Sequence, residues 1–194
     1  SDGLDGEGRR LLGQVRGGAR RMGRLVDDLL RLSRLSRVEL RREEVDVSAL
    51  AEQIGSELAE AEPGRIVRLE VAPGLRARGD RALLQVLLAN LLRNAWKFTA
   101  RREEAHVAVG RVVGGDGEGI FVKDDGAGFD PAYAGHLFRP FHRLHAPEEF
   151  EGTGIGLALV DLIVRRHGGR VEAEGEPEKG ATFRFFLPES SAGA

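Results

Sequence analysis

The sequence predicts an α/β (α+β) fold that is preceded by a long helix resembling a coiled coil. Apolar residues recur alternately four and three apart over residues 7–37, and beyond residue 45 helical periodicities are interspersed with short alternating runs. We therefore expect residues 1–44 to form a helix and a connector, residues 45–190 to form one globular domain, and residues 191–194 to form a tail.

The first helix is expected to lie within a larger helical assembly. The heptad positions of its apolar seam are Leu11, Val15, Gly18, Met22, Leu25, Leu29 and Leu32. Further apolar residues widen this seam beyond the need of a two-stranded coiled coil, which favours a four-helix bundle. Packing of the helix onto its own domain is the simpler alternative. The polar residues 37–44 form the connector.

The globular domain is expected to contain seven strands and three helices. The strand-like runs are 45–47, 66–71, 75–78, 106–113, 119–123, 170–173 and 182–187. The helical runs are 48–62, 81–98 and 155–167, with Ser48 and Asp80 as the predicted caps of the first two. His167 ends the third helix beside two arginines, which the helix dipole would explain. Residues 125–152 are irregular, except that Asp130 and Pro131 predict a short helix.

Composition excludes several classes of protein. The chain has 194 residues and 41% hydrophobic content, which is enough for a core, while a net charge of −2 argues against nucleic acid as a partner. It has no cysteine, which excludes disulfides and thiolate metal sites. Neither a membrane-spanning run nor a signal-peptide pattern is present in the sequence, so we expect a cytoplasmic location.

Polar residues flank the apolar stripe of the second helix. Asn90, Asn94 and Lys97 are spaced i, i+4 and i+7, so they share one helical face beside the leucines. Such groups are costly in a core, but they suit a cleft that holds a hydrated cation and phosphates.

Two glycine-containing segments follow in the chain. Residues Asp124-Asp125-Gly126-Ala127-Gly128 come directly after a predicted strand, where a carboxylate accepts a hydrogen bond from an amine and glycines admit a flat base. Residues 152–157, Gly-Thr-Gly-Ile-Gly-Leu, open a predicted helix whose free amide groups would face an anion. An ordinary turn and a flexible loop are the simpler alternatives.

In this order the motifs resemble those of one family. Residues from about 45 to 188 resemble the catalytic and ATP-binding domain of sensor histidine kinases, which has the Bergerat-type nucleotide fold. Residues 90–97 look like its N box, 124–128 its G1 box, Phe138-Arg-Pro-Phe141-His-Arg143 its F box, and 152–157 its G2 box. The resemblance implies a two-layer sandwich with a mixed sheet and helices on one face.

The same resemblance implies roles for individual residues. Asn94 would ligate Mg²⁺ with Asn90 in support, Lys97 would contact phosphate, and Asp124 would bind the adenine amino group. Asn90, Lys97 and Arg143 would be the catalytic residues, Arg143 by contacting the γ-phosphate. The other nucleotide-binding residues would be Gly126, Gly128, Gly152, Thr153, Gly154, Gly156 and Leu157.

Asn90 separates this chain from relatives that use a base. Hydrolytic ATPases of this fold, and anti-sigma-factor serine kinases, carry a glutamate at the corresponding position. An amide takes no proton near neutral pH, so the sequence favours phosphoryl transfer to a histidine, which is already nucleophilic. The alternatives are a nucleotide-dependent interaction module without kinase activity and an ATPase of this fold.

The phosphoacceptor histidine of the family is not recognisable in this chain. None of the five histidines lies in a predicted helix of the phosphotransfer hairpin, and residues 1–44 look like the second helix of that hairpin. We therefore expect a fragment that does not phosphorylate itself. The resemblance implies a homodimer through the first helix, a response regulator receiver domain and an upstream sensor domain as partners. The carboxy-terminal strands look like those of phytochrome-type or PAS-linked kinases.

Overall fold

The computed structural model describes residues 39–114, 117–142, 144, 150 and 152–188, together with positions 7–8, 11–13, 15–16, 18–19 and 22–23. The chain divides into two compact units, Ser1–Arg37 and Val38–Ala194. Every described position of the first unit is helical, and three seam residues, Leu11, Val15 and Met22, are exposed. The seam residues Leu25, Leu29 and Leu32 lie outside the described residues.

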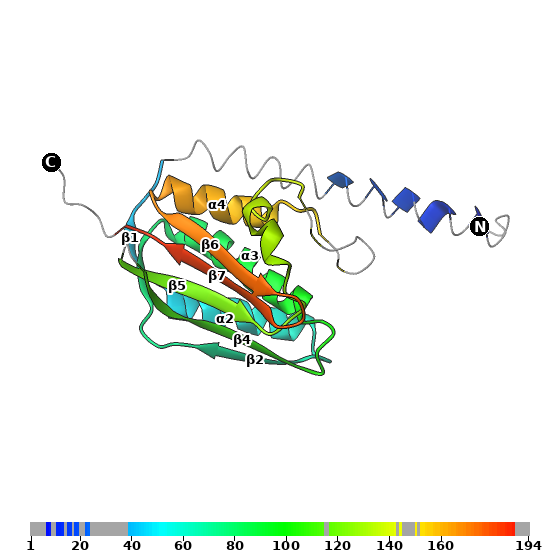
Figure 1. Ribbon diagram of the computed structural model, residues 1–194, viewed down its shortest axis with the longest axis horizontal. Coiled ribbons are helices and arrows are strands. Elements are labelled where there is room, and N and C mark those ends of the chain that lie inside the picture. The colour runs from blue at the N-terminus through cyan, green and yellow to red at the C-terminus, as the bar shows by residue number, and fades with distance from the viewer. Residues whose placement is uncertain are drawn as a thin grey trace. The chain divides into compact units, whose positions relative to one another are not determined.

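The second unit is a sheet covered by helices on one face. The sheet has the strand order β2 (Ile66–Val71), β4 (Glu104–Gly114), β5 (Gly117–Asp124), β7 (Gly180–Phe186) and β6 (Arg170–Glu176). β2 pairs with β4 in parallel and the other pairs are antiparallel. Helices α2 (Val47–Ala61), α3 (Arg81–Phe98) and α4 (Gly156–Arg166) cover the same face (Figure 1). The predicted two-layer architecture is therefore confirmed.

The core lies between the sheet and the helices. Ile120 and Val122 of β5 pair with Phe185 and Phe183 of β7, and all four side chains are buried. Because side chains alternate along a strand, Asp124 comes next in this helix-facing row, opposite Ala181. The strand thus carries one carboxylate into the edge of an apolar core.

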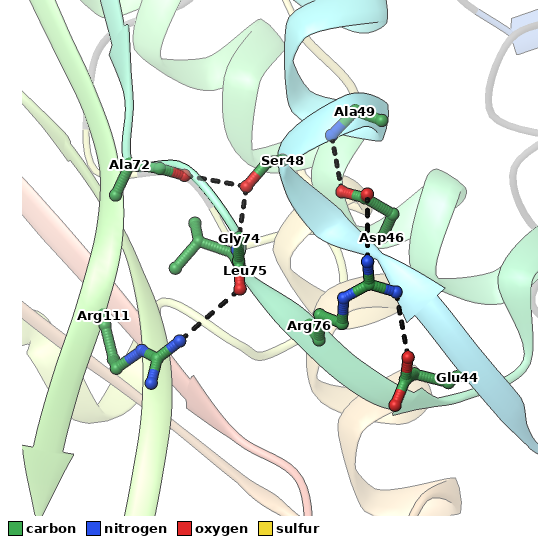
Figure 2. Close-up of polar contacts among 9 residues, drawn as sticks. All are labelled: Glu44, Asp46, Ser48, Ala49, Ala72, Gly74, Leu75, Arg76 and Arg111. Atoms are coloured by element: carbon green, nitrogen blue, oxygen red, sulfur yellow. Dashed lines mark hydrogen bonds and ion pairs between the residues drawn. The ribbon is translucent and has the colours of Figure 1, made fainter.

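A small second sheet lies at the start of this unit. It consists of β1 (Glu43–Asp46) and β3 (Arg76–Gly79), which pair antiparallel. The guanidinium of Arg76 lies 2.9 Å from a carboxylate oxygen of Glu44 and 3.9 Å from one of Asp46 (Figure 2). These ion pairs join the two short strands across their exposed surface.

The predicted cap of the first domain helix is wrong. Asp46, not Ser48, caps α2, because its carboxylate accepts a hydrogen bond of 3.0 Å from the Ala49 amide. The buried hydroxyl of Ser48 instead donates to the Ala72 carbonyl at 2.7 Å and accepts from the Leu75 amide at 2.9 Å (Figure 2). Ser48 therefore satisfies the backbone of the loop between β2 and β3.

The predicted helix starts at Asp80 and Asp130 are confirmed. Asp80 caps α3, and Asp130 caps the 3₁₀ helix η1 (Pro131–His136) by accepting a bond of 2.9 Å from the Ala132 amide. No helix in the described part of the chain is long and apolar enough to cross a membrane.

Candidate functional site

Helix α3 presents the polar face that its sequence predicts. Its buried side chains are Leu83, Leu84, Leu87, Leu88, Leu91, Leu92, Ala95 and Trp96. Asn90, Asn94 and Lys97 are half-buried beside this stripe. The amide nitrogen of Asn90 donates to the Val86 carbonyl at 2.8 Å, which leaves its oxygen as the group that faces outward from the helix.

The amide oxygen of Asn90 lies against the beginning of α4. A Cβ atom on Gly156, the first residue of α4, would lie only 2.8 Å from that oxygen. The glycine therefore allows the N box and the G2 box to approach each other closely.

Lys97 connects the end of α3 with the first glycine of the G2 box. Its ammonium nitrogen lies 4.0 Å from the centroid of the Phe98 ring, and a Cβ on Gly152 would lie 3.3 Å from the same nitrogen. The positive charge is thus held beside the segment that leads into α4.

The G1 box is attached to the same end of α3. The Ala127 amide donates to the Phe98 carbonyl at 3.0 Å, and a Cβ on Gly126 would lie 2.5 Å from that carbonyl oxygen. Gly128 has a φ of 61°, and a Cβ there would lie 1.9 Å from the Glu176 carbonyl oxygen. Both glycines are therefore required by close backbone contacts.

Asp124, the first residue of the G1 box, has a buried side chain with an exposed fraction of 4%. Its Oδ1 accepts a hydrogen bond of 2.9 Å from the Gly126 amide. Burial raises the pKa of Asp124 to about 6, and the amides of Gly126 and Ala181 only partly offset this effect. A carboxyl group with this pKa changes its charge close to neutral pH, and a hydrogen-bond donor beside it favours the ionised form.

The G2 box forms the amino-terminal end of α4. Gly152 and Gly154 have φ angles of 156° and 76°, and the Phe141 amide donates to the Gly154 carbonyl at 3.0 Å. Ile155, at the cap position, makes no capping hydrogen bond with its side chain. The first amides of α4 therefore lack a side-chain cap, as an anion-binding helix end requires.

Phe150, between the G1 and G2 boxes, packs on the last residue of α3. The ring of Phe150 is buried and meets the Phe98 ring edge-to-face, with centroids 5.0 Å apart. Phe141, which is exposed, has a φ of 64°, a conformation uncommon outside glycine. The predicted catalytic residue Arg143 lies outside the described residues.

The three segments thus meet around the second half of α3. Phe98 is a contact that the sequence did not reveal: its carbonyl holds the G1 box, and its ring packs on Phe150. Thr153, which precedes α4, and Leu157, its second residue, were also predicted and are half-buried.

The explanation of His167 by the helix dipole is wrong. The side chain is 1% exposed, and its ring nitrogens contact the Asp80 amide and the Ile163 carbonyl. Burial, as the main cause, lowers the pKa of His167, so the ring is neutral rather than a cation at the helix end.

Comparison with known proteins gives consistent matches. A family model described as "Histidine kinase-, DNA gyrase B-, and HSP90-like ATPase" matches residues 79–191, which is more than half of the chain. Methanogenesis regulatory histidine kinase FilI of Methanothrix harundinacea is 33% identical over 187 residues, which cover 95% of this chain and 21% of that protein. Cyanobacterial phytochrome A of Nostoc sp. is 33% identical over 193 residues, covering 96% and 24%. The phosphate regulon sensor protein PhoR of Pseudomonas aeruginosa is 33% identical over 192 residues, covering 95% and 43%.

Solved structures agree with these relatives. Full-length ShkA in complex with AMPPNP has a TM-score of 0.71 and 29% identity, covering 99% of this chain and 41% of that one. The ATP binding domain of PrrB from Mycobacterium tuberculosis has a TM-score of 0.57 and 26% identity, covering 77% and 98%. The chain spans less than half the length of the three curated relatives. Because phytochrome A and PhoR are equally similar to it, the phytochrome-type subfamily stays a prediction.

Proposed function

Because the chain belongs to the family of histidine kinase-, DNA gyrase B- and HSP90-like ATPases, we propose that it is the ATP-binding catalytic portion of a sensor histidine kinase. One observation carries this proposal: the N, G1 and G2 boxes, far apart in the sequence, meet at the second half of α3. The reaction is transfer of the ATP γ-phosphoryl group to a histidine located outside this chain.

The base-binding part of the site is assigned to the G1 box. The carboxyl group of Asp124 accepts a hydrogen bond from the adenine amino group, and Gly126 and Gly128 keep the neighbouring backbone free of side chains. The burial of Asp124 supports this role, since its raised pKa reflects lost contact with water.

The phosphates are assigned to Lys97 and to the G2 box. The uncapped amides at the start of α4 and the ammonium group of Lys97 point to an anion in the same region. This part of the site is assigned a lining of Gly152, Thr153, Gly154, Gly156 and Leu157. Arg143 remains a predicted γ-phosphate ligand.

The N box fits a magnesium ion. Mg²⁺ prefers oxygen ligands, and the amide nitrogen of Asn90 is occupied by the Val86 carbonyl, so its oxygen is the free ligand atom. Asn94, one turn further along the same face, is assigned as the main ligand and Asn90 as its support. When bound, the ion neutralises phosphate charge; the residues of this chain orient the nucleotide.

No proton acceptor for water is assigned to this site. Asn90 occupies the position of the base in hydrolytic relatives, and an amide does not accept a proton near neutral pH. In the proposed reaction the bond between the γ-phosphorus and the bridging oxygen breaks, and a phosphorus–nitrogen bond to an imidazole forms. ADP keeps the electron pair of the broken bond, and the imidazole proton leaves to solvent.

We also propose that residues 1–44 contribute the second helix of the phosphotransfer hairpin and that the chain forms a homodimer through it. The exposed Leu11, Val15 and Met22 support a partner on this seam. A response regulator receiver domain, an upstream sensor domain and a cytoplasmic location remain predictions for the whole protein.

The test combines calorimetry with radiolabelled ATP. The purified chain should bind Mg-ATP, should not label itself, and should label a separately expressed acceptor hairpin with an acid-labile phosphate. Binding without any transfer would favour a nucleotide-dependent interaction module, and steady phosphate release without acceptor would favour an ATPase. Absence of ATP binding would reject the proposed site itself.

A further inference from the structure

The ends of α3 and α4 opposite to the candidate site are joined by one histidine. The Asp80 amide donates to Nε2 of His167 at 3.0 Å, and Nδ1 of His167 donates to the Ile163 carbonyl at 2.7 Å. A carbonyl only accepts and an amide N–H only donates, so these two contacts define the neutral tautomer that carries its proton on Nδ1. The ring therefore links the beginning of α3 to the end of α4.

This contact leaves little space for adjustment. His167 is among the largest fully buried side chains, and a Cβ on Gly79 would lie 2.9 Å from two atoms of its ring. Asp80 is constrained as well, since its Oδ1 accepts a hydrogen bond of 3.2 Å from the Leu83 amide as the cap of α3. Close packing of this kind transmits a displacement instead of absorbing it.

The connector before β1 contacts the same two residues. The Arg41 amide donates to Oδ2 of Asp80 at 3.1 Å, and the Arg42 guanidinium donates to the His167 carbonyl at 3.1 Å. One carboxylate and one histidine thus hold three segments: the connector, the beginning of α3 and the end of α4.

The candidate site lies at the second half of α3 and at the beginning of α4, away from the contact between Asp80 and His167. Asn90 lies ten residues beyond Asp80, or about 15 Å along α3, since a helix rises about 1.5 Å per residue. Gly156 opens α4, which packs along α3. A rotation of one helix against the other at Asp80 and His167 would therefore change the separation of Asn90 from Gly156.

We propose that His167 is a positioning residue for the ATP-binding site and that Arg42 makes the connector part of the same contact. The relative placement of α3 and α4, and with it nucleotide affinity, thereby depends on the conformation of residues 39–42. This inference rests on the proposed function, because it concerns regulation of the same site.

The test compares two variants that each lose the two hydrogen bonds of a buried side chain. His167→Phe keeps a ring but removes both bonds, whereas Ser48→Ala removes the bonds to Ala72 and Leu75, two residues outside α3 and α4 (Figure 2). Calorimetric ATP affinity is measured where circular dichroism shows each variant folded. His167→Phe should weaken binding about three- to thirtyfold, the range of couplings carried through packed elements, and Ser48→Ala should leave it unchanged.

A conservative variant tests the hydrogen bond itself. His167→Gln retains an acceptor near Nε2 and should recover part of the affinity lost in His167→Phe. Equal ATP affinity in His167→Phe and the unmodified chain would overturn the proposal, as would equal losses in His167→Phe and Ser48→Ala. If His167→Phe does not fold, His167→Gln and Arg42→Ala carry the same comparison. Failure of the unmodified chain to bind ATP would reject the proposed function instead.

The role of the connector is tested with neighbouring arginines. Arg42→Ala removes the bond to the His167 carbonyl, whereas Arg41→Ala removes the same charge but leaves its backbone bond to Asp80. Hydrogen exchange should become faster in residues 80–98 and 156–167 for Arg42→Ala, with a measurable loss of ATP affinity. Equal exchange and equal affinity in the two variants would contradict a specific connector contact.

Discussion

The two ends of the α3–α4 pair are built differently. At what we call the closed end, Asp80 and His167 are hydrogen-bonded to each other and to the connector, and the histidine ring is buried. At what we call the open end, Asn90, Asn94 and Lys97 are half-buried beside two glycines of the G2 box. Satisfied polar groups stabilise a fold, whereas accessible ones bind ligands. One pair of helices thus has a structural contact at one end and candidate ligand-binding groups at the other.

The largest expected effect is at the open end. Asn94→Ala removes the proposed main magnesium ligand, so Mg²⁺-dependent ATP affinity should fall about tenfold to 100-fold, as for a lost bond to a charged group. Its unfolding free energy should change by less than about 0.5 kcal/mol, because the side chain is not buried. Calorimetry and urea unfolding measure the two quantities, and Arg93→Ala, on the exposed side of α3, is the control. Near-normal affinity would contradict the assigned role.

Adding a methyl group to a glycine at each end should affect different properties of the protein. Gly79→Ala places a Cβ 2.9 Å from the His167 ring and should lower the unfolding free energy by about 1–3 kcal/mol, the cost of overpacking. Gly156→Ala places a Cβ 2.8 Å from the Asn90 oxygen and should mainly weaken ATP binding. The unfolding free energy of Gly156→Ala should change little. The helix propensity of alanine is better than that of glycine by up to about 1 kcal/mol, which offsets the cost of the close contact.

The control for this pair is Gly64→Ala. Gly64 has no atom within 4 Å of an added Cβ, so neither stability nor affinity should change. The comparison between the two ends would fail if Gly79→Ala and Gly156→Ala changed the two measured quantities in the same ratio.

The open end could largely be predicted from the sequence, because its signals are local. The leucine periodicity of α3, the Asp80 cap and the order of the glycine motifs each depend on residues close in the chain. The sequence alone does not locate the start of α2, because Asp46 and Ser48 are both good caps and lie only two residues apart. Burial of Ser48 by the β2–β3 loop decided between them.

The closed end could not be predicted in the same way. The contact between Asp80 and His167 joins residues 87 positions apart, and no local pattern indicates a bond to a backbone amide. One signal was present: His167 continues the i+4 series of the buried residues Ile155, Leu159 and Ile163. A histidine on an apolar stripe predicts a buried, neutral ring better than a dipole contact.

A smaller effect at the open end should depend on pH. The pKa of Asp124 is raised to about 6 by burial, so the carboxyl group ionises as the pH rises through that value. Because its folded pKa lies above its ordinary value of 3.8, its contribution to stability is present below pH 3.8 and is lost as the pH rises through 6. Binding changes in the opposite direction, since the ionised group is the better acceptor for an amine.

Inosine triphosphate isolates this effect, because it lacks the adenine amino group and has the same phosphates. The ratio of ATP affinity to inosine triphosphate affinity should rise about tenfold between pH 5 and pH 7.5, because the ionised fraction of a carboxyl group with a pKa of about 6 rises about tenfold over this range. Calorimetry at several pH values measures this ratio. A ratio independent of pH would contradict the contact between Asp124 and the base.

The smallest expected effect is at the closed end, and it has the opposite sign for stability. The pKa of His167 is lowered from 6.5 by burial, so below pH 6.5 the unfolded chain takes up a proton that the folded chain resists. The stabilising contribution is therefore present above pH 6.5 and is lost as the pH falls through the folded pKa. Because one proton is involved, the loss between pH 6.5 and 5.5 is at most about 1 kcal/mol.

Urea unfolding across this range should show the loss in the unmodified chain and not in His167→Gln, since glutamine does not titrate. The Asp124 contribution is common to both proteins and cancels in their difference. Identical pH dependence in the two proteins would mean that His167 is not held neutral by its contacts with Asp80 and Ile163.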